Sequence, residues 1–310
     1  MSEPDDAVLF PGFRSCRLAV EADVCIDALV GGSGPPLLLL HGHPQTRAMW
    51  HKLAPALALS HTLVMPDLRG YGSSSKPAGL PDHANYAKRR MALDQITLMR
   101  SLGFDAFDVL AHDRGARVAH RLAMDHPAAV GRMVLLDIAP TLAMYEQTGF
   151  EFATAYWHWF LLIQPAPLPE RLIEADPGAY LREVIGRRSA GLAPFAPAAL
   201  DAYERALSRP FAAHGICEDY RASAGIDLEH DRADRAAGRM LHAPLLVLWG
   251  EQSVVNRCFR PLQEWQCVAA SVQGEALPCG HYIAEEAPDL LFQRVMPFLH
   301  AGATDGDARA

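Results

Sequence analysis

The sequence lacks any apolar stretch long enough to cross a bilayer, and it lacks an excess of basic side chains. Its 36 acidic residues outnumber 28 Lys and Arg residues, which gives a formal net charge of −8. Nucleic acids and anionic membrane surfaces repel such a chain, so we expect neither as a partner. The acidic segment 1–6 also differs from a secretory signal, which is basic and then apolar. We therefore expect a cytoplasmic protein.

Cysteine is scarce and irregularly spaced, and no Cys-x-x-Cys pair occurs. The six cysteines are Cys16, Cys25, Cys217, Cys258, Cys267 and Cys279. In a chain of this length the pattern indicates reduced packing residues rather than a disulfide framework or a metal site. The glycine-rich turn at 67–73 lacks the spacing of a phosphate-binding loop. We therefore expect neither a metal ion nor a cofactor.

Residues 107–124 combine a buried strand, a sharp turn and a helix. An apolar run at 107–110 precedes the turn, and a helical pattern follows at 116–124. In an elbow of the form small-x-nucleophile-x-Gly, the central side chain is held exposed beside helix-start N–H groups. Asp113 is central here, so the elbow predicts a carboxylate nucleophile. The alternative is that Asp113 only caps the helix.

Two arginines follow in the first turn of the same predicted helix. Arg114 and Arg117 oppose the helix dipole there, at a cost of roughly 0.3–1 kcal/mol each if they are exposed. An arginine fork binds a carboxylate through two hydrogen bonds, so their placement indicates an anionic ligand. The segment predicts an acidic small molecule presented to a carboxylate nucleophile.

Outside the elbow, short apolar runs alternate with helical segments, and no internal repeat is apparent. Strands are predicted at 17–20, 24–29, 37–40, 61–65, 132–136 and 244–248, with a last one ending at 277. Helices are predicted at 46–59, with an interruption at Pro55, and at 87–102, 260–268 and 288–300. The alternation indicates a mostly parallel sheet flanked by helices, and with the elbow it predicts an α/β-hydrolase core.

The alternation of strands and helices stops at about residue 141 and resumes at 240. The intervening stretch is helix-like and rich in aromatics and prolines, so we predict an inserted helical cap over the strand ends. The predicted organisation is a core of residues 1–140 and 240–300, a cap of residues 141–239 and a disordered tail of residues 301–310.

The base and its acid are expected after the elbow, in the order nucleophile, acid, histidine. His281 lies in the loop after the last predicted strand, although a loop histidine is often merely exposed. Asp137 follows a predicted strand and is the candidate acid, with Glu251 in reserve; Asp137 could instead cap a turn. Earlier, the loop containing His43 can offer a backbone N–H to an oxyanion, and His43 itself fits a pocket wall better than a base.

The motifs resemble those of the haloacetate (fluoroacetate) dehalogenases of the α/β-hydrolase superfamily. The resemblance covers roughly residues 11–299 and rests on HGHPQTRAMW (41–50), DLRGYG (67–72), HDRGAR (112–117), LLDIAPT (135–141), YWHW with QPAP (156–159, 164–167), CEDYRA (217–222) and CGH (279–281). It implies hydrolysis of a short 2-haloacid, such as fluoroacetate or chloroacetate, to a 2-hydroxy acid and halide. It also implies a homodimer.

The resemblance assigns a role to each matching residue of the core. Asp113 would be the nucleophile that forms an ester, His281 the base that activates water, and Asp137 the acid that orients it. Arg114 and Arg117 would hold the carboxylate of the substrate.

Further roles fall to the cap and to two backbone groups. His158, Trp159 and Tyr220 would donate hydrogen bonds to the departing halide, and the backbone N–H groups of His43 and Arg114 would form the oxyanion hole. Fluoride is strongly hydrated, so a dry site must replace its water with fixed donors. Without the resemblance, the three cap side chains would be interpreted as packing residues of the cap.

Two positions depart from the family pattern. His43 stands where relatives commonly have Phe, and Ile185-Gly186-Arg187-Arg188 replaces a stretch that often contains Gly-Trp. We expect the gain of Arg187 and the loss of a tryptophan to alter the volume or charge of the pocket. The preferred haloacid and the efficiency of fluoride release would then change, while the mechanism would not.

An epoxide hydrolase with the same Asp-His-Asp triad is the main alternative. It would need cap tyrosines to protonate the epoxide oxygen, and Tyr145, Tyr156 and Tyr220 are available. An uncharged epoxide would leave Arg117 without a ligand, and Arg114 occupies a position where that group more commonly has Trp. A non-catalytic ligand-binding protein is a third hypothesis, against which the complete triad argues.

Overall fold

The computed structural model describes residues 6–188 and 190–301, and within them the strands form a single sheet. The strands are β1 (Arg14–Glu21), β2 (Val24–Gly32), β3 (Pro36–Leu40), β4 (Thr62–Pro66), β5 (Phe107–His112), β6 (Val130–Leu136), β7 (Leu245–Gly250) and β8 (Val272–Leu277). Their order across the sheet is β1-β2-β4-β3-β5-β6-β7-β8. β2 is antiparallel to both β1 and β4, and all other neighbours are parallel.

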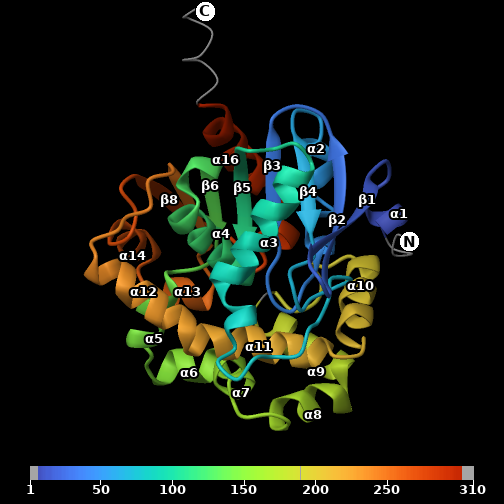
Figure 1. Cartoon of the computed structure of the whole chain (residues 1–310), viewed down its shortest axis with the longest axis vertical. Coiled ribbons are helices and arrows are strands. Elements are labelled where there is room, and N and C mark those ends of the chain that lie inside the picture. The colour runs from blue at the N-terminus through green and yellow to red at the C-terminus, as the bar shows by residue number, and fades with distance from the viewer. Residues whose placement is uncertain (1–5, 189, 302–310) are drawn as a thin grey trace, which may run out of the picture.

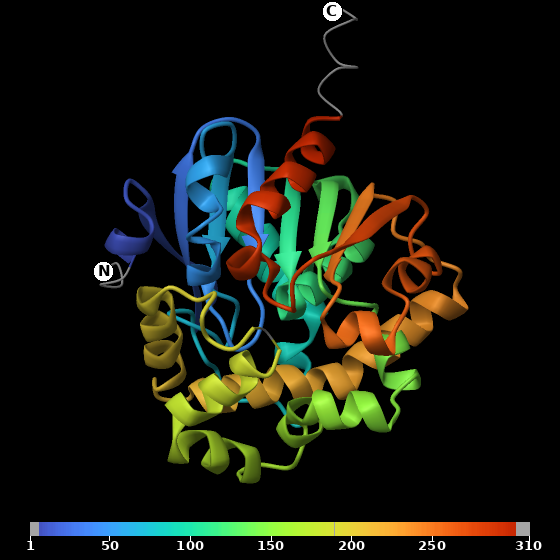
Figure 2. The ribbon, with the colours of Figure 1, turned by 180° about the vertical axis from the view of Figure 1, so that it is seen from behind.

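Helices cover both faces of the parallel part of the sheet, and this explains its apolar strands. α3 (Lys88–Ser101) and α4 (Asp113–Asp125) lie on the face seen in Figure 1, and α16 (Pro288–His300) lies on the face seen in Figure 2. Leu37 to Leu40 of β3 are completely buried, as expected for a strand covered on both sides. The shorter core helices are α1 (Asp6–Leu9), α2 (Ala54–Leu57), α13 (Val254–Cys258), α14 (Pro261–Gln266) and α15 (Ile283–Glu286).

Every described element between β6 and β7 is a helix. These elements, called the cap helices below, are α5 (Thr141–Glu146), α6 (Phe150–Ala155), α7 (Trp157–Leu162), α8 (Leu168–Ala175), α9 (Pro177–Gly186), α10 (Pro197–Leu207), α11 (Ala212–Ala224) and α12 (Ile226–Ala236). Figures 1 and 2 show them gathered at one end of the sheet. That end holds the carboxyl ends of the parallel strands, where ligands of open α/β sheets bind.

The predicted strands are all present, and one predicted helix is broken differently from what we expected. Residues 46–59 form a 3-10 helix (Arg47–Trp50) and then α2, with a turn between them. We placed the interruption at Pro55, but Pro55 lies in the first turn of α2, where its missing N–H is not needed. The break therefore precedes the proline. Residues 302–310 of the predicted tail lie outside the described residues.

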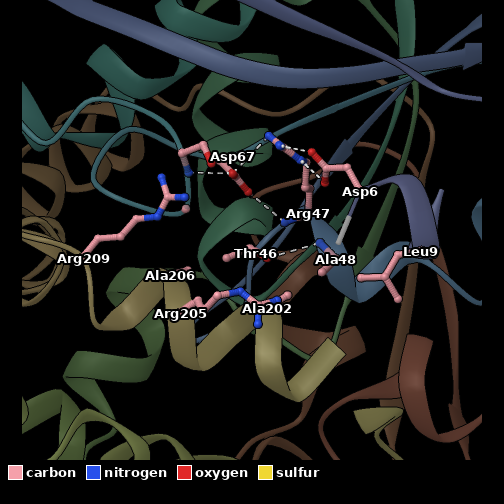
Figure 3. A pocket seen from close by; sticks show the side chains of 12 residues that line it. Asp6, Leu9, Thr46, Arg47, Ala48, Asp67, Ala202, Arg205, Ala206 and Arg209 are labelled. Carbon is pink, nitrogen blue, oxygen red and sulfur yellow. Dashed lines mark hydrogen bonds and ion pairs between the residues drawn. The ribbon is translucent and has the colours of Figure 1, made fainter. Parts of the chain in front are cut away.

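A buried arginine joins the start of the chain to the sheet. Arg47 donates to Asp6 at 2.8 Å, to Asp27 at 2.7 Å and to Asp67 at 3.1 Å. Figure 3 shows Arg47 with Asp6 and Asp67, and α10 of the cap faces them. Burial alone would lower the pKa of Arg47, but the carboxylates, foremost Asp67, raise it above its ordinary value. The cluster is a structural ion network between core elements, beside a cap helix.

The described residues also bear on two expectations from the sequence, which concern membrane-spanning helices and the state of the cysteines. No helix within 6–188 or 190–301 combines the length and the apolar character that crossing a membrane would require. All six cysteines are free, in agreement with the expected reduced state.

Candidate active site

The turn between β5 and α4 places Asp113 at a strained position directly under the cap helices. Its backbone φ is +45°, in the left-handed region that aspartate tolerates better than most residues. Close packing of backbone forces this geometry. A Cβ on Gly42 would lie 2.5 Å from that of Asp113, and one on Gly115 would lie 2.5 Å from the carbonyl oxygen of His41. Both glycines of the elbow region are therefore required for the turn to pack against the loop after β3.

The Asp113 carboxylate is buried and held by two groups from different loops. Its Oδ1 accepts a hydrogen bond from the backbone N–H of His43 at 2.9 Å, and its Oδ2 lies 3.8 Å from Nε2 of His281. Burial alone would raise the pKa of Asp113, but the His281 imidazole and the Arg188 guanidinium hold it well below its usual range. The carboxylate is thus charged at neutral pH, and Oδ2 is the oxygen free to react.

His281 and Asp137 meet through a short hydrogen bond. Nδ1 of His281 lies 2.5 Å from Oδ2 of Asp137, whose Oδ1 accepts from the backbone N–H of Gly250 at 2.9 Å. Burial raises the pKa of Asp137 to about 7, while burial and Arg188 lower the pKa of His281 to about 3. A neutral imidazole whose Nδ1–H faces Asp137 leaves Nε2 unprotonated beside Asp113. Glu251, the reserve candidate for the acid, is exposed at the surface.

Arg114 is held by an acidic residue of cap helix α11. Its Nε and Nη2 donate to the two carboxylate oxygens of Asp219 at 2.8 and 2.9 Å, and Nη2 also donates to the Ser223 hydroxyl at 2.8 Å. Its Nη1 is buried and has no partner among the described residues. Burial alone would lower the pKa of Arg114, but Asp219 raises it well above the ordinary value. Arg114 is therefore a fixed cation with one donor nitrogen left for a ligand.

Arg117 is buried without any carboxylate within salt-bridge distance in the described part of the chain. Nη1 donates to the hydroxyl of Thr141 at 2.8 Å, Nη2 contacts the sulfur of Met144 at 3.1 Å, and Nε has no partner. Its guanidinium carbon lies 4.7 Å from the ring centre of Trp159. Burial and the charge of Arg114 lower the pKa of Arg117. A buried cation in these surroundings is stabilised by an anionic ligand.

Three polar groups of the cap are buried and unpartnered, and their rings lie side by side. They are Nε2 of His158, Nε1 of Trp159 and the hydroxyl of Tyr220. The Tyr220 ring centre lies 6.1 Å from that of His158 and 6.2 Å from that of Trp159, and the Arg114 guanidinium stacks 4.1 Å from it. Each unsatisfied buried donor costs about 1–3 kcal/mol, so a cluster of three indicates a site for an acceptor or anion.

The structure corrects our expectation about Arg187. The Arg187 side chain is exposed and pairs with Glu183 at 2.6 Å, so it does not change the pocket. The next residue does, because Arg188 is buried and its Nη1 lies 3.2 Å from Nε2 of His281. α9 ends at Gly186, so helical periodicity does not predict which of the next two arginines points inward. The sequence therefore located the change in charge but assigned it to the wrong residue.

His43, the other departure, is buried and lines the same site. Its ring stacks on that of His158 at 5.9 Å, its Nε2 lies 3.0 Å from the hydroxyl of Tyr180, and its Nδ1 has no partner among the described residues. Burial lowers the pKa of His43 to about 3, so the ring is neutral. This agrees with the expected pocket wall.

Among the described residues, no group of three or more His, Cys, Asp or Glu side chains could hold a metal ion.

Comparison with known proteins identifies the family of this chain. Residues 35–288 match the model of the alpha/beta hydrolase fold. The chain belongs to this family. It is 46% identical to a fluoroacetate dehalogenase from Burkholderia sp. over 91% of this chain and 92% of that protein. The resemblance that the motifs suggested is confirmed by this relative.

Two other relatives carry the name of epoxide hydrolases. The soluble epoxide hydrolase of Corynebacterium sp. strain C12 is 32% identical over 87% of this chain and 92% of its own. A mutant protein from Pseudomonas aeruginosa, provisionally described as an epoxide hydrolase and solved with bound MFA, is 44% identical. Its structure superposes with a TM-score of 0.88 over 94% of this chain and 97% of that one.

Proposed function

We propose that this α/β hydrolase is a hydrolytic dehalogenase that cleaves the carbon–halide bond of short 2-haloacids, such as fluoroacetate and chloroacetate. The observation that carries the proposal is the unpartnered donor cluster of His158, Trp159 and Tyr220 next to a charged carboxylate. A leaving halide needs such donors, since it departs as an anion into a buried site. The relative named for fluoroacetate supports the same chemistry.

Binding of the haloacid would place its carboxylate against Arg117 and the free Nη1 of Arg114. Nη1 of Arg114 and Nε of Arg117 are both buried without a partner among the described residues. The substrate carboxylate would supply the anion that Arg117 lacks. The halogen would then face the donor cluster on the cap, with the α-carbon between the cluster and Asp113. This arrangement aligns nucleophile, carbon and leaving group for displacement.

The first chemical step would form an ester and release the halide. Oδ2 of Asp113 attacks the α-carbon, the carbon–halide bond breaks, and the halide leaves with the electron pair. The donors of the cap receive the negative charge that Asp113 gives up. Oδ1 keeps its hydrogen bond to the His43 N–H and becomes the carbonyl oxygen of the ester.

The second step would hydrolyse that ester. Nε2 of His281 takes a proton from water, and the resulting hydroxide adds to the Asp113 side-chain carbon. The His43 N–H stabilises the oxyanion that develops on Oδ1, and Asp137 stabilises the imidazolium. Collapse releases the 2-hydroxy acid and restores Asp113, and His281 returns one proton to solvent.

Halide release tests the proposal directly. With an ion-selective electrode, the wild-type protein should release fluoride from fluoroacetate and chloride from chloroacetate, and Asp113→Ala should lower the rate by at least about 10⁴-fold. Styrene oxide serves as the control for the alternative chemistry. Diol formed from the epoxide, with no halide from either acid, would overturn the dehalogenase in favour of an epoxide hydrolase.

A further inference from the structure

We propose that Arg188 forms a second anion-binding subsite beside the catalytic histidine, and that the protein also accepts 2-haloacids bearing a second carboxylate, such as a 2-halosuccinate. The inference rests on the proposed function, because it extends the substrate class of the same site. The reaction is unchanged: Asp113 displaces halide from the α-carbon, water cleaves the ester, and one proton is released.

The contacts of Arg188 are all with neutral acceptors. Nη2 donates to the carbonyl oxygen of His43 at 3.0 Å, Nε donates to that of Val184 at 3.1 Å, and Nη1 donates to Nε2 of His281 at 3.2 Å. These bonds use three of its five N–H groups. No carboxylate of the described residues lies within salt-bridge distance, although the side chain is only 5% exposed. Arg188 is therefore a buried cation with free donors and no counterion of its own.

Once Asp113 has become an ester and the halide has left, the charges around it leave room for two negative groups. Arg114 is neutralised by Asp219, whereas Arg117 and Arg188 have no carboxylate partner and share the field of Asp113. When Asp113 becomes an ester it loses its charge, so both arginines then face a neutral group. One substrate carboxylate can balance only one of them, and a second carboxylate balances the other.

Two further polar groups border Arg188 and can bind the second carboxylate with it. Nδ1 of His43 is buried and has no partner among the described residues, and the hydroxyl of Tyr282 is buried within reach of the Arg188 guanidinium. The ring centre of Tyr282 lies 5.2 Å from the Arg188 guanidinium carbon, and the His43 backbone already accepts from Arg188. A guanidinium, a hydroxyl and a ring nitrogen in one buried place form a site that suits a carboxylate.

The position of Arg188 also gives the second carboxylate a part in turnover. Nη1 occupies Nε2 of His281, the nitrogen that must accept a proton from water. A carboxylate that draws the guanidinium to itself frees this nitrogen. Substrates with a second carboxylate are therefore expected to pass through ester hydrolysis faster than those without one.

The test compares chloride release from chloroacetate and from racemic 2-chlorosuccinate. Arg188→Met removes the charge at similar length, and Arg187→Met is the matched control, because that neighbour is exposed and paired with Glu183. Arg188→Met should lower the ratio of kcat/KM for 2-chlorosuccinate to kcat/KM for chloroacetate by at least about tenfold, the usual effect of losing a charged hydrogen bond. Arg187→Met should change neither.

The outcomes separate this inference from the proposed function. Chloride from chloroacetate alone, or an equal loss on both acids in Arg188→Met, overturns the second subsite and leaves the dehalogenase in place. Chloride from neither acid overturns both. If Arg188→Met does not fold, inhibition of wild-type turnover of chloroacetate decides the matter: succinate should bind at least about tenfold more tightly than butanoate, and equal inhibition contradicts the subsite.

Discussion

In the proposed mechanism the residues of the triad perform separable steps, and the intermediate between these steps can be trapped. His281→Asn keeps a side chain of similar shape at Nδ1 but removes the base, so ester formation on Asp113 should proceed while its hydrolysis stops. Intact-protein mass spectrometry after chloroacetate treatment should show one adduct per chain at Asp113. An inactive but unmodified variant, with a substrate that the wild-type protein turns over, would contradict the covalent mechanism.

The pH dependence of turnover should also report on a single residue. Burial and the positive charge of Arg188 both lower the pKa of His281, so the base stays neutral, and kcat stays high, well below the ordinary histidine pKa of about 6.5. Arg188→Met removes one of the two causes, which raises the pKa of His281. The fall of kcat on the acid side should therefore move to higher pH in this variant, as a pH–rate profile would show. A shift to lower pH would contradict the assigned contact.

The sequence predicts most of the residues of this site because their order and spacing are themselves informative. Asp113 lies at the centre of an elbow, and His281 and Asp137 follow in the order of the family. Nothing comparable identifies Arg188, because its role depends on how the chain turns after α9. Its contact with His281 spans 93 residues of sequence, and such a contact follows from tertiary packing alone.

At the level of elements, α4 and α11 are joined by buried ions rather than by apolar contact alone. Asp219 of α11 accepts from Arg114 of α4, from Lys88 of α3 and from the Tyr71 hydroxyl at 2.7 Å. Asp219→Asn leaves the buried Arg114 without a carboxylate partner, while Lys88 keeps Asp227 at 3.3 Å, so the free energy of unfolding should fall by about 3–5 kcal/mol in urea denaturation. A loss below about 1 kcal/mol would contradict the assigned network.

A matched control for that experiment is present on the surface. Arg235 and Glu146 form a pair with a similar distance, 2.8 Å, but both are exposed. Arg235→Ala should leave the urea midpoint unchanged, because solvent screens this ion pair. An effect equal to that of Asp219→Asn would mean that burial does not distinguish the two pairs.

The strands follow from the sequence better than the cap helices do. A short run such as Leu37 to Leu40 is apolar at every position, which is typical of a strand covered on both faces, and all four residues are buried. The continuous helix expected at 46–59 does not form, because the Thr46 hydroxyl accepts a hydrogen bond from the Ala48 N–H and caps a short 3-10 helix. Arg47 also pairs with carboxylates from distant parts of the sequence. Local pattern does not contain those partners.

For the whole molecule, the network around Arg47 connects segments that are distant in sequence. It ties α1, through Asp6, to β2 and to the loop after β4, next to cap helix α10 (Figure 3). Arg47→Met leaves Asp67 without an arginine partner and Asp27 with only Arg17, at 3.4 Å, so the free energy of unfolding should drop by about 3–5 kcal/mol in urea. Unchanged stability would show that the carboxylates are satisfied without the arginine.

The homodimer implied by the family resemblance stays a prediction, which sedimentation would test.

The ion pair between Arg114 and Asp219 also constrains how a small molecule reaches Asp113. One partner belongs to the helix of the nucleophile and the other to the cap, so swinging the cap helices away as a body would pull two buried charges apart. We therefore expect ligands to enter and leave through local side-chain motion, so that their cross-section limits access before any chemistry occurs. On the proposed function, a haloacid with a bulky branched chain would then be excluded, however well its reactive end matched the triad.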